Sequence, residues 1–474
     1  MDPILVLSIV GGYFIFLMII SALTSRVGGN EAFYIGNRNS PWFLVAFGMI
    51  GATLSGVTFI SVPGKVGADN FYYFQIVLGY ILGYLVIALV LLPLYYKLKL
   101  VSIYAYLDQR FGPTSYKTGA SFFLLSRIIG ASFRLFLVAI VLKKSLFDPI
   151  GVPFWVSVVI TIALIWAYTF RGGIKTIVWT DTLQTFFMIT SVLVTIFLIG
   201  DKMDKSLSEL TTLIIESDYS KAFNWEFKEK AYFWKNFLAG AFITIAMTGL
   251  DQDMMQKNLS CRNLKDAQKN MFSFTAVLVV INIIFLSLGA LLYLYSNSID
   301  MTMPERADLL FPTIALEHLG LFGGIMFLLG ITAAAYSSAD SALTALTTSF
   351  CVDILDNKDI SKKRRNLVHL LFSCIIFIVI MVFEAINDQS VIDAIFQIAG
   401  YTYGPLLGLY SFGLFSKKDV HDPYVPWVAV ASPILTYIIN ANSEAWLFGY
   451  KFNFELLILN GAITFLGLWL IRKK

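Results

Sequence analysis

Apolar stretches long enough to cross a lipid bilayer recur along almost the whole sequence, and no other feature constrains its fold as strongly. A hydrocarbon core about 30 Å thick is crossed by a helix of roughly 20 apolar residues. A helix also satisfies its own backbone hydrogen bonds, which lipid cannot do. The sequence therefore predicts an all-α polytopic membrane protein with about thirteen transmembrane helices. Their expected limits are 3–23, 41–63, 71–95, 118–142, 153–170, 178–200, 234–252, 271–296, 320–350, 367–385, 391–415, 424–441 and 453–471.

The composition excludes a water-soluble protein. Of the 474 residues, 57% are apolar and only 14% are charged, with a mean hydropathy of +0.74. A soluble chain with this composition would expose more apolar surface than keeps a monomer dispersed. The net charge of +4 is too small to favour nucleic acid as a partner. We therefore expect a lipid bilayer around the chain, and no obligate protein partner is evident.

Motifs that carry enzyme chemistry are absent from the sequence. No nucleophile elbow or phosphate-binding loop occurs in the expected loops, so an enzyme is not predicted. The few cysteines and histidines are too scattered to predict a disulfide framework or a zinc site. They are Cys261, Cys351 and Cys374, and His318, His369 and His421.

Lysine and arginine indicate the orientation of the chain, because cytoplasmic loops hold an excess of both. They gather in alternate loops, as in 97–110, 257–269 and 362–365, whereas an intervening loop such as 300–308 is acidic. This pattern predicts an external N-terminus and a cytoplasmic C-terminus. The first apolar stretch has no basic leader or cleavage site, so we expect a retained helix. The lack of long polar tails favours a multi-pass protein of a bacterial inner membrane.

Two arginines lie inside an expected span, where an ionisable side chain costs about 2.5 kcal/mol or more and marks a candidate functional residue. Arg127 and Arg134 are seven residues apart, which places them on one helix face about 10 Å apart along the axis. Each could form a structural pair with a carboxylate of a neighbouring helix. Alternatively, at least one of them binds an anionic substrate.

Carboxylates and hydroxyls cluster in other spans. Asp340 follows Ser337 and Ser338 in a run of small residues, and hydroxyl and carboxylate oxygens suit a small hard cation. Asp181 could be such a ligand, or it could cap a helix that begins beside Thr180. Asp251 and Asp253, at the end of the span 234–252, are expected to make gate or loop contacts and not to bind an ion.

The second span contains three glycines and several hydroxyls near the expected centre of the bilayer, between Gly48 and Thr58. Glycine costs about 1 kcal/mol in a helix interior, so this run weakens the helix. Transporters use such unwound helices to bind sodium through freed carbonyls and to face the substrate. Close helix packing is the alternative explanation of the glycines.

Six segments, taken in order, resemble the sodium/solute symporter family, which includes proline, pantothenate, sugar, iodide and sialic acid transporters. The likeness runs across nearly the whole chain. The segments are 31–38, 102–112, 172–181 with Trp179-Thr180-Asp181, 251–256 with Asp251, Gln252 and Gln256, 337–341 and 403–408.

This resemblance implies a leucine-transporter-like fold within a single transmembrane domain, 1–474. Two inverted repeats of about five helices each would occupy 41–200 and 234–415, joined by an external loop at 201–232. One helix at 3–23 would precede the repeats, and two helices within 424–471 would follow them. The implied function is sodium-coupled symport of a small organic solute by alternating access.

The resemblance also implies ion ligands. The main sodium site would use the carbonyls of Gly51, Leu54 and Ala334 and the hydroxyls of Ser337 and Ser338. Some members have a second sodium site, for which the matching positions here are Asp181, Ser337, Asp340 and Ser341. Asp340 stands where the family has a hydroxyl, so it could bind sodium or carry a proton.

For the solute, the sialic acid branch offers the closest local match and implies contacts beside the broken helix and an arginine that pairs with a carboxylate. Arg134 is the expected arginine and Arg127 its competitor. Gly56 departs from that branch, which has serine there. A carboxylate-bearing solute, either a sialic or related sugar acid or a monocarboxylate, is favoured over a neutral sugar. The expected solute contacts are Thr53, Ser55, Thr58, Gln75, Arg134 and Arg127.

Two alternatives to sodium symport remain at this point. A proton-coupled carrier on the same fold would titrate Asp340 or Asp181. A membrane sensor or channel is a different class, but a channel needs a repeated filter or a charged ring, and neither is visible in the sequence.

Overall fold

The computed structural model describes residues 3–24, 38–143, 147–148, 151–169, 173–357, 360–386 and 391–473, and these residues are almost entirely helical. Among them no β-strand forms, and only two isolated β-bridges occur, Ser40 with Cys261 and Val420 with Arg472. The matched positions 31–37 and 172 lie outside the described residues.

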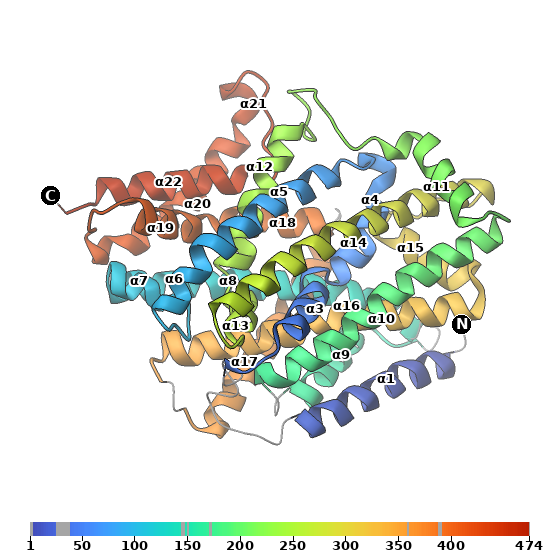
Figure 1. The fold of residues 1–474 in the computed structure, drawn as a ribbon, viewed down its shortest axis with the longest axis horizontal. Helices are drawn as coiled ribbons and strands as arrows, with labels where there is room; N and C mark the ends of the chain where they lie inside the picture. The colour runs from blue at the N-terminus through green and yellow to red at the C-terminus, as the bar shows by residue number, and fades with distance from the viewer. Residues whose placement is uncertain are drawn as a thin grey trace.

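The helices of the first half of the chain pack lengthwise against those of the second. Figure 1 shows α14 between α5 and α10, with which it is in contact. The first-half helices are α1 (Pro3–Thr24), α3 (Trp42–Thr53), α4 (Gly56–Asp69), α5 (Tyr73–Val86), η2 (Ile87–Leu91), α6 (Leu92–Lys97), α7 (Ala105–Arg110), α8 (Pro113–Leu142), α9 (Phe154–Thr169), α10 (Gly173–Lys202) and α11 (Leu207–Glu216). The second-half helices are α12 (Phe233–Thr244), η6 (Ile245–Gly249), α13 (Gln252–Leu259), α14 (Leu264–Ser298), α15 (Leu310–Thr313), η8 (Ile314–His318), α16 (Gly320–Ser349), η9 (Phe350–Ile354), α17 (Lys362–Ile386), α18 (Val391–Thr402), α19 (Gly404–Phe415), α20 (Val425–Ala441), α21 (Ser443–Trp446) and α22 (Leu456–Leu470).

Helices long and apolar enough to cross a membrane make up most of the described chain. Eight such helices occur there, and two bent helix pairs raise the number to ten if each pair is one span. Shorter apolar helices lie in α9, α18, α19 and α22. Each expected span overlaps one helix or a run of consecutive helices.

The glycine-rich span is broken, as the sequence predicts. α3 and α4 are bent by 55° at Leu54 and Ser55. The glycines also serve close packing, because a Cβ added at Gly51 would overlap Thr185 Oγ1 of α10. A Cβ at Gly48 would lie 3.1 Å from Asp181 Cβ. The glycine run therefore serves both the helix break and close helix packing.

A second break follows α12 and η6, at the end of the expected span 234–252. The chain bends by 66° and continues as α13. Asp251 is the N-cap of α13, and its carboxylate accepts hydrogen bonds from the backbone N–H of Asp253 at 2.9 Å and of Met254 at 3.3 Å. The cap satisfies the orphan donors at this helix start. The span 391–415 is likewise divided, into α18 and α19, at Tyr403.

Small residues let the two broken spans approach their neighbours. α5 and α12 meet at Gly79 and Gly240, and a Cβ at Gly240 would overlap the carbonyl oxygen of Ile76. Close backbone contact of this kind is a usual means of helix association in lipid. It fixes α12 beside α5 and sets where α13 begins.

Candidate functional site

A buried cavity lies where the break between α3 and α4 faces α8, α12, α14 and α18. Its lining includes Thr53, Ser55 and Thr58 from the break and Arg127 and Arg134 from α8. Hydroxyls and guanidinium groups thus converge on one space within a largely apolar molecule. Five of the six expected solute contacts line it.

Arg134 is the cationic group that remains available in this cavity. Its Nε is buried and has no hydrogen-bond partner among the described residues, and the same holds for Arg127 Nε and Thr53 Oγ1. A buried unpaired donor costs free energy, and a bound acceptor would recover it. A carboxylate is such an acceptor, and a guanidinium can hold it with two parallel hydrogen bonds.

Arg127 is instead engaged with the protein. Its guanidinium pairs with Asp253, and its NH1 lies 3.8 Å from the Asp251 carboxylate. Both carboxylates belong to the segment at the start of α13, and all three side chains are buried. Arg127 thus has a carboxylate partner within the protein, whereas Arg134 has no ion pair among the described residues. Asp251 and Asp253 thus make buried contacts at the start of α13, where gate or loop contacts were expected.

Gln75, the sixth expected solute contact, does not line the cavity. Its amide donates to the carbonyl oxygens of Tyr72 at 3.2 Å and Ala231 at 3.0 Å, and it accepts from Asn224 N–H at 3.3 Å. The side chain is fully buried. These hydrogen bonds connect the 201–232 loop to the start of α5.

Oxygen atoms converge on the other side of the break, between α3 and α16. Ser338 Oγ lies 3.3 Å from the carbonyl oxygen of Ala52 and 3.4 Å from that of Ala334. A Cβ added at Gly51 would lie 3.4 Å from Ser337 Oγ, so this glycine also borders the cluster. The Ala52 carbonyl was not among the expected ligands. It lies in the last turn of α3, which ends with Leu54 N–H donating to Ile50 O at 2.8 Å.

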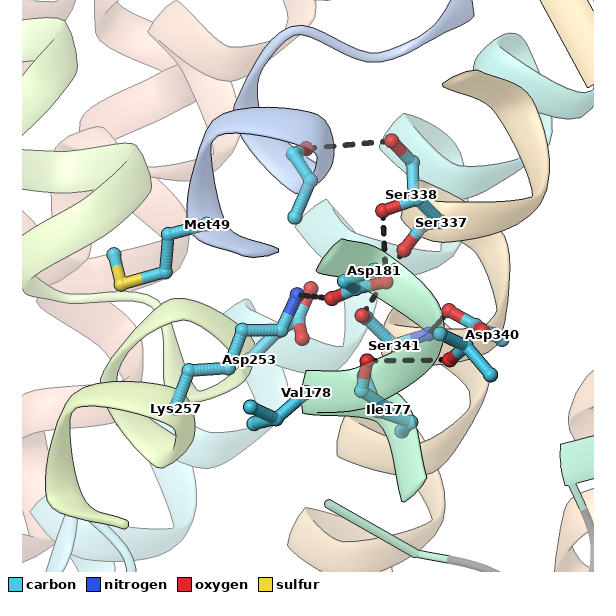
Figure 2. A network of polar contacts seen from close by, with 12 residues as sticks. Met49, Ile177, Val178, Asp181, Asp253, Lys257, Ser337, Ser338, Asp340 and Ser341 are labelled. Atoms are coloured by element: carbon cyan, nitrogen blue, oxygen red, sulfur yellow. Dashed lines mark hydrogen bonds and ion pairs between the residues drawn. The ribbon is translucent and has the colours of Figure 1, made fainter. Parts of the chain in front are cut away.

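Asp181 joins this cluster to a lysine. One carboxylate oxygen accepts from Ser337 Oγ at 2.8 Å, and the other lies 2.7 Å from Lys257 Nζ of α13. In Figure 2 the Lys257 side chain extends from α13 toward Asp181 of α10. Because α10 begins at Gly173, Asp181 lies well inside the helix, and the alternative that it caps a helix start is wrong.

Lys257 was missed as a site residue. Its place among the basic residues of 257–269 predicts a cytoplasmic loop, yet only 1% of its side chain is exposed. One signal was present: Lys257 is four residues after Asp253 and directly follows Gln256 of a matched segment. On a helix that spacing places Lys257 and Asp253 on the same face.

Asp340 and Ser341 lie farther along α16. Asp340 is fully buried, and one of its oxygens accepts from Ser341 N–H at 2.5 Å. Ser341 Oγ donates to the carbonyl oxygen of Ser337 at 3.0 Å. These hydroxyl and carboxylate groups lie about one helical turn beyond the Ser337 and Ser338 pair.

A second, polar cavity adjoins the first. Its lining shares Tyr73, Ile392 and Phe396 with the first cavity. Lys65 of α4 also lines it and forms ion pairs with Asp393 of α18 at 2.7 Å and with Asp69 at 2.8 Å. Three bulky side chains thus separate a polar outer cavity from the inner one.

On the opposite side, the start of α13 is held by many polar contacts, and every residue of α13 is buried. Tyr403 Oη donates to Asp251 Oδ2 at 2.6 Å. Tyr104 Oη donates to the carbonyl oxygen of Leu250 at 2.8 Å, and Gln252 Nε2 donates to that of Val101 at 3.0 Å. These contacts close the inner cavity on the side of α13.

Comparison with known proteins places this geometry among transporters. The model of the Sodium:solute symporter family matches residues 33–421. The sodium/sialic acid symporter SiaT of Proteus mirabilis is 23% identical over 430 residues, covering 86% of this chain and 84% of that protein. The sodium/sialic acid symporter NanT of Aliivibrio fischeri is 23% identical over 455 residues, covering 92% and 87%. Sodium-coupled monocarboxylate transporter 1 of the mouse is 24% identical over 412 residues, covering 82% and 65%.

The fold of this chain also resembles those of solved transporter structures. A sodium-coupled sialic acid symporter in a substrate-bound outward-open state superimposes with a TM-score of 0.82 at 21% identity, covering 99% of this chain and 98% of that one. A nucleobase-cation-symport-1 family transporter in a closed conformation gives 0.57 at 12% identity, covering 93% and 94%. At these identities the likeness establishes the fold and leaves the ligands to be argued from the residues.

Proposed function

Because the chain belongs to the sodium:solute symporter family, we propose that it carries an organic solute into the cell together with sodium, by alternating access. The chain is a transporter and not an enzyme, and sodium is its coupling ion. We further propose about thirteen membrane crossings arranged as two inverted repeats, 41–200 and 234–415, with an external N-terminus. The bacterial relatives support a bacterial inner membrane as the location.

One observation carries the ion site: the break between α3 and α4 brings the Ala52 carbonyl to within 3.3 Å of Ser338 Oγ. Sodium is a hard cation that prefers carbonyl and hydroxyl oxygens. The proposed ligands are the carbonyls of Gly51, Leu54 and Ala334 and the hydroxyls of Ser337 and Ser338. Sodium bound there would join α3 to α16 in place of the present hydrogen bond.

The solute is proposed to lie in the inner cavity, with its carboxylate on Arg134. Arg134 has no ion pair among the described residues, whereas Arg127 pairs with Asp253, and this difference supports the role. The hydroxyls of Thr53, Ser55 and Thr58 would contact the rest of the molecule. A sialic or related sugar acid is the first candidate, in keeping with SiaT and NanT. A monocarboxylate is the second, in keeping with the mouse relative.

Coupling follows from the shared break. The proposed sodium ligands, residues 51 and 54, alternate along the chain with the proposed solute contacts at Thr53 and Ser55. Sodium that fixes this backbone therefore also fixes the solute site, which gives the differential affinity that coupling requires. Each sodium ion that enters through about 100 mV contributes about 2.3 kcal/mol.

Alternating access would use the two closures already described. On the outer side the closure comprises Tyr73, Ile392 and Phe396 with the Lys65 and Asp393 pair. The other closure is the start of α13 with its contacts to Arg127 and Tyr403. Opening one while the other stays closed would expose the inner cavity to one side at a time.

Proton coupling is the second candidate, and the full burial of Asp340 is the observation that favours it. A carboxylate without water around it is costly to keep charged, so it could take up a proton. Uptake that follows pH and ignores sodium would support this candidate.

Uptake by the purified protein in proteoliposomes tests the proposal. Radiolabelled sialic acid, lactate and glucose are compared under an inward sodium gradient and under an equal potassium gradient, with Ser338→Ala as the matched ion-site variant. We expect sodium-dependent uptake of an acid, strongly reduced in the variant. Equal uptake under both gradients would rule out sodium coupling, whereas sodium-driven uptake of glucose alone would rule out only the acidic solute.

A further inference from the structure

We propose that the ammonium group of Lys257 acts as a tethered cation at Asp181, so that the transporter binds a single sodium ion where some relatives would bind a second at this carboxylate. The inference deepens the proposed function and rests on it. It concerns the ion stoichiometry and names the residue that determines it.

Both oxygens of the Asp181 carboxylate already have donors. Lys257 Nζ lies 2.7 Å from Oδ2, and Ser337 Oγ lies 2.8 Å from Oδ1 (Figure 2). The side chains of Asp181 and Lys257 are 0% and 1% exposed, so water does not screen the pair. A sodium ion at Asp181 would have to displace the ammonium group.

The carboxylates around the pair have partners of their own. Asp340 of α16, one turn beyond Ser337, accepts from the backbone N–H of Ser341. Asp253 lies on the same face of α13 as Lys257, but it pairs with Arg127. Asp251 accepts from Tyr403 and lies 3.8 Å from Arg127. Sodium added beside Lys257 would therefore share the Asp181 carboxylate with the ammonium group, and two positive charges on one buried carboxylate are strongly disfavoured at low dielectric.

The pair is also placed to act on the proposed sodium site, which a purely structural ion pair need not do. Ser337, a proposed sodium ligand, donates to Asp181. Thr185 Oγ1 links the same turn of α10 to α3 through the carbonyl oxygens of Asp181 at 2.7 Å and Phe47 at 3.0 Å. Lys257 thus contacts α16 through the Asp181 carboxylate and Ser337, while Thr185 connects the backbone of the same turn of α10 to α3.

Counting bound sodium tests the idea without any solute. Equilibrium binding of radioactive sodium is measured on the purified full chain and on three variants: Lys257→Gln, Lys257→Arg and the charge-neutral double variant Asp181→Asn with Lys257→Gln. We expect one sodium per chain in the wild type, in Lys257→Arg and in the double variant. Lys257→Gln should double the bound sodium, because it leaves the carboxylate free for a second ion.

The remaining outcomes separate this inference from the proposed function. Two ions in the wild type, or no gain in a folded Lys257→Gln variant, would refute the tethered cation and leave sodium symport intact. If Lys257→Gln does not fold, the double variant decides: an unchanged count supports the proposal, and a lost ion shows that Asp181 binds sodium. An absence of sodium binding in the wild type, unchanged by Ser338→Ala, would instead contradict the proposed function.

Discussion

Lys65 of α4 and Asp393 of α18 form a 2.7 Å ion pair in the wall of the outer cavity. Asp393 lies on the same turn of α18 as Ile392 and Phe396, two of the side chains that separate the outer cavity from the inner one. The pair therefore holds this part of α18 against α4, which continues from the proposed sodium site.

Breaking this pair should loosen the outer closure. A cysteine introduced at Ile395, which lines the inner cavity, reports access in a background without Cys261, Cys351 and Cys374. A partly exposed ion pair contributes about 0.2–1 kcal/mol, so Lys65→Met should raise the labelling rate by a membrane-impermeant thiol reagent up to about fivefold. Exchange of the two charged residues should restore part of the closure. An unchanged rate would argue against a gating role.

Arg134→Gln should weaken acid binding and leave the fold intact. A hydrogen bond to a charged group contributes about 1.5–3 kcal/mol, so the solute affinity should fall by roughly ten- to a hundredfold. Isothermal titration with sialic acid at saturating sodium measures this change. Sodium binding should stay as in the wild type, and an unaltered solute affinity would remove Arg134 from the site.

Arg127→Gln should instead destabilise the protein. The substitution leaves Asp253 buried without its partner, which costs about 3–5 kcal/mol. Thermal unfolding in detergent should show a lower midpoint than for Arg134→Gln. Adding Asp253→Asn should recover most of the loss, because the remaining buried carboxylate, Asp251, keeps its hydrogen bonds from Tyr403 and from two backbone N–H groups. A stable Arg127→Gln protein with weak solute binding would reverse the roles given to the two arginines.

Removing a proposed sodium hydroxyl should reduce ion affinity. We expect Ser338→Ala to raise the sodium concentration for half-maximal stabilisation by about tenfold, equivalent to about 1.4 kcal/mol. Ser341→Ala is the control, because its hydroxyl donates to the carbonyl oxygen of Ser337 in its own helix. Thermal shift against sodium chloride, with choline chloride as the reference salt, gives both values. Similar losses in the two variants would place sodium nearer Asp340.

Close packing of α5 and α12 predicts a steric effect. In Gly240→Ala the new methyl group would overlap the carbonyl oxygen of Ile76, and overpacking of this kind costs about 1–3 kcal/mol. Gly130→Ala in α8 is the matched control, since no atom lies within 4 Å of its added Cβ. Comparison of the two unfolding midpoints tests this helix contact. Equal midpoints would mean that the helices separate easily there.

The sequence was sufficient for the helical architecture and for the first break. Long apolar runs permit little other than membrane helices, and three glycines between residues 48 and 56 weaken one of them at its centre. The second break was missed because Asp251 stands at the end of an apolar run, where it looks like the end of a span. In the structure it caps the next helix, α13, whose polar side chains are buried by partners far away in the sequence.

The role of a side chain depends on which neighbouring helix it faces, and residue spacing within one helix does not predict this. Their spacing places Arg127 and Arg134 on one face of α8 and does not distinguish them. Only the position of α13 shows that Arg127 pairs with Asp253. For the same reason Lys257 was read as a loop residue, because its partner Asp181 is 76 positions away. Gln75 contacts the 201–232 loop, whose path the sequence did not predict.

The break between α3 and α4 also limits how such a transporter can acquire a new cargo. The proposed ion ligands at 51 and 54 are adjacent in the chain to the proposed solute contacts Thr53 and Ser55. A substitution at either solute contact would therefore disturb sodium binding as well as solute binding. The walls contributed by α8, α12, α14 and α18 do not carry proposed ion ligands. Diversification of the transported molecule, in nature or by engineering, should therefore proceed through those walls while the break itself stays nearly unchanged.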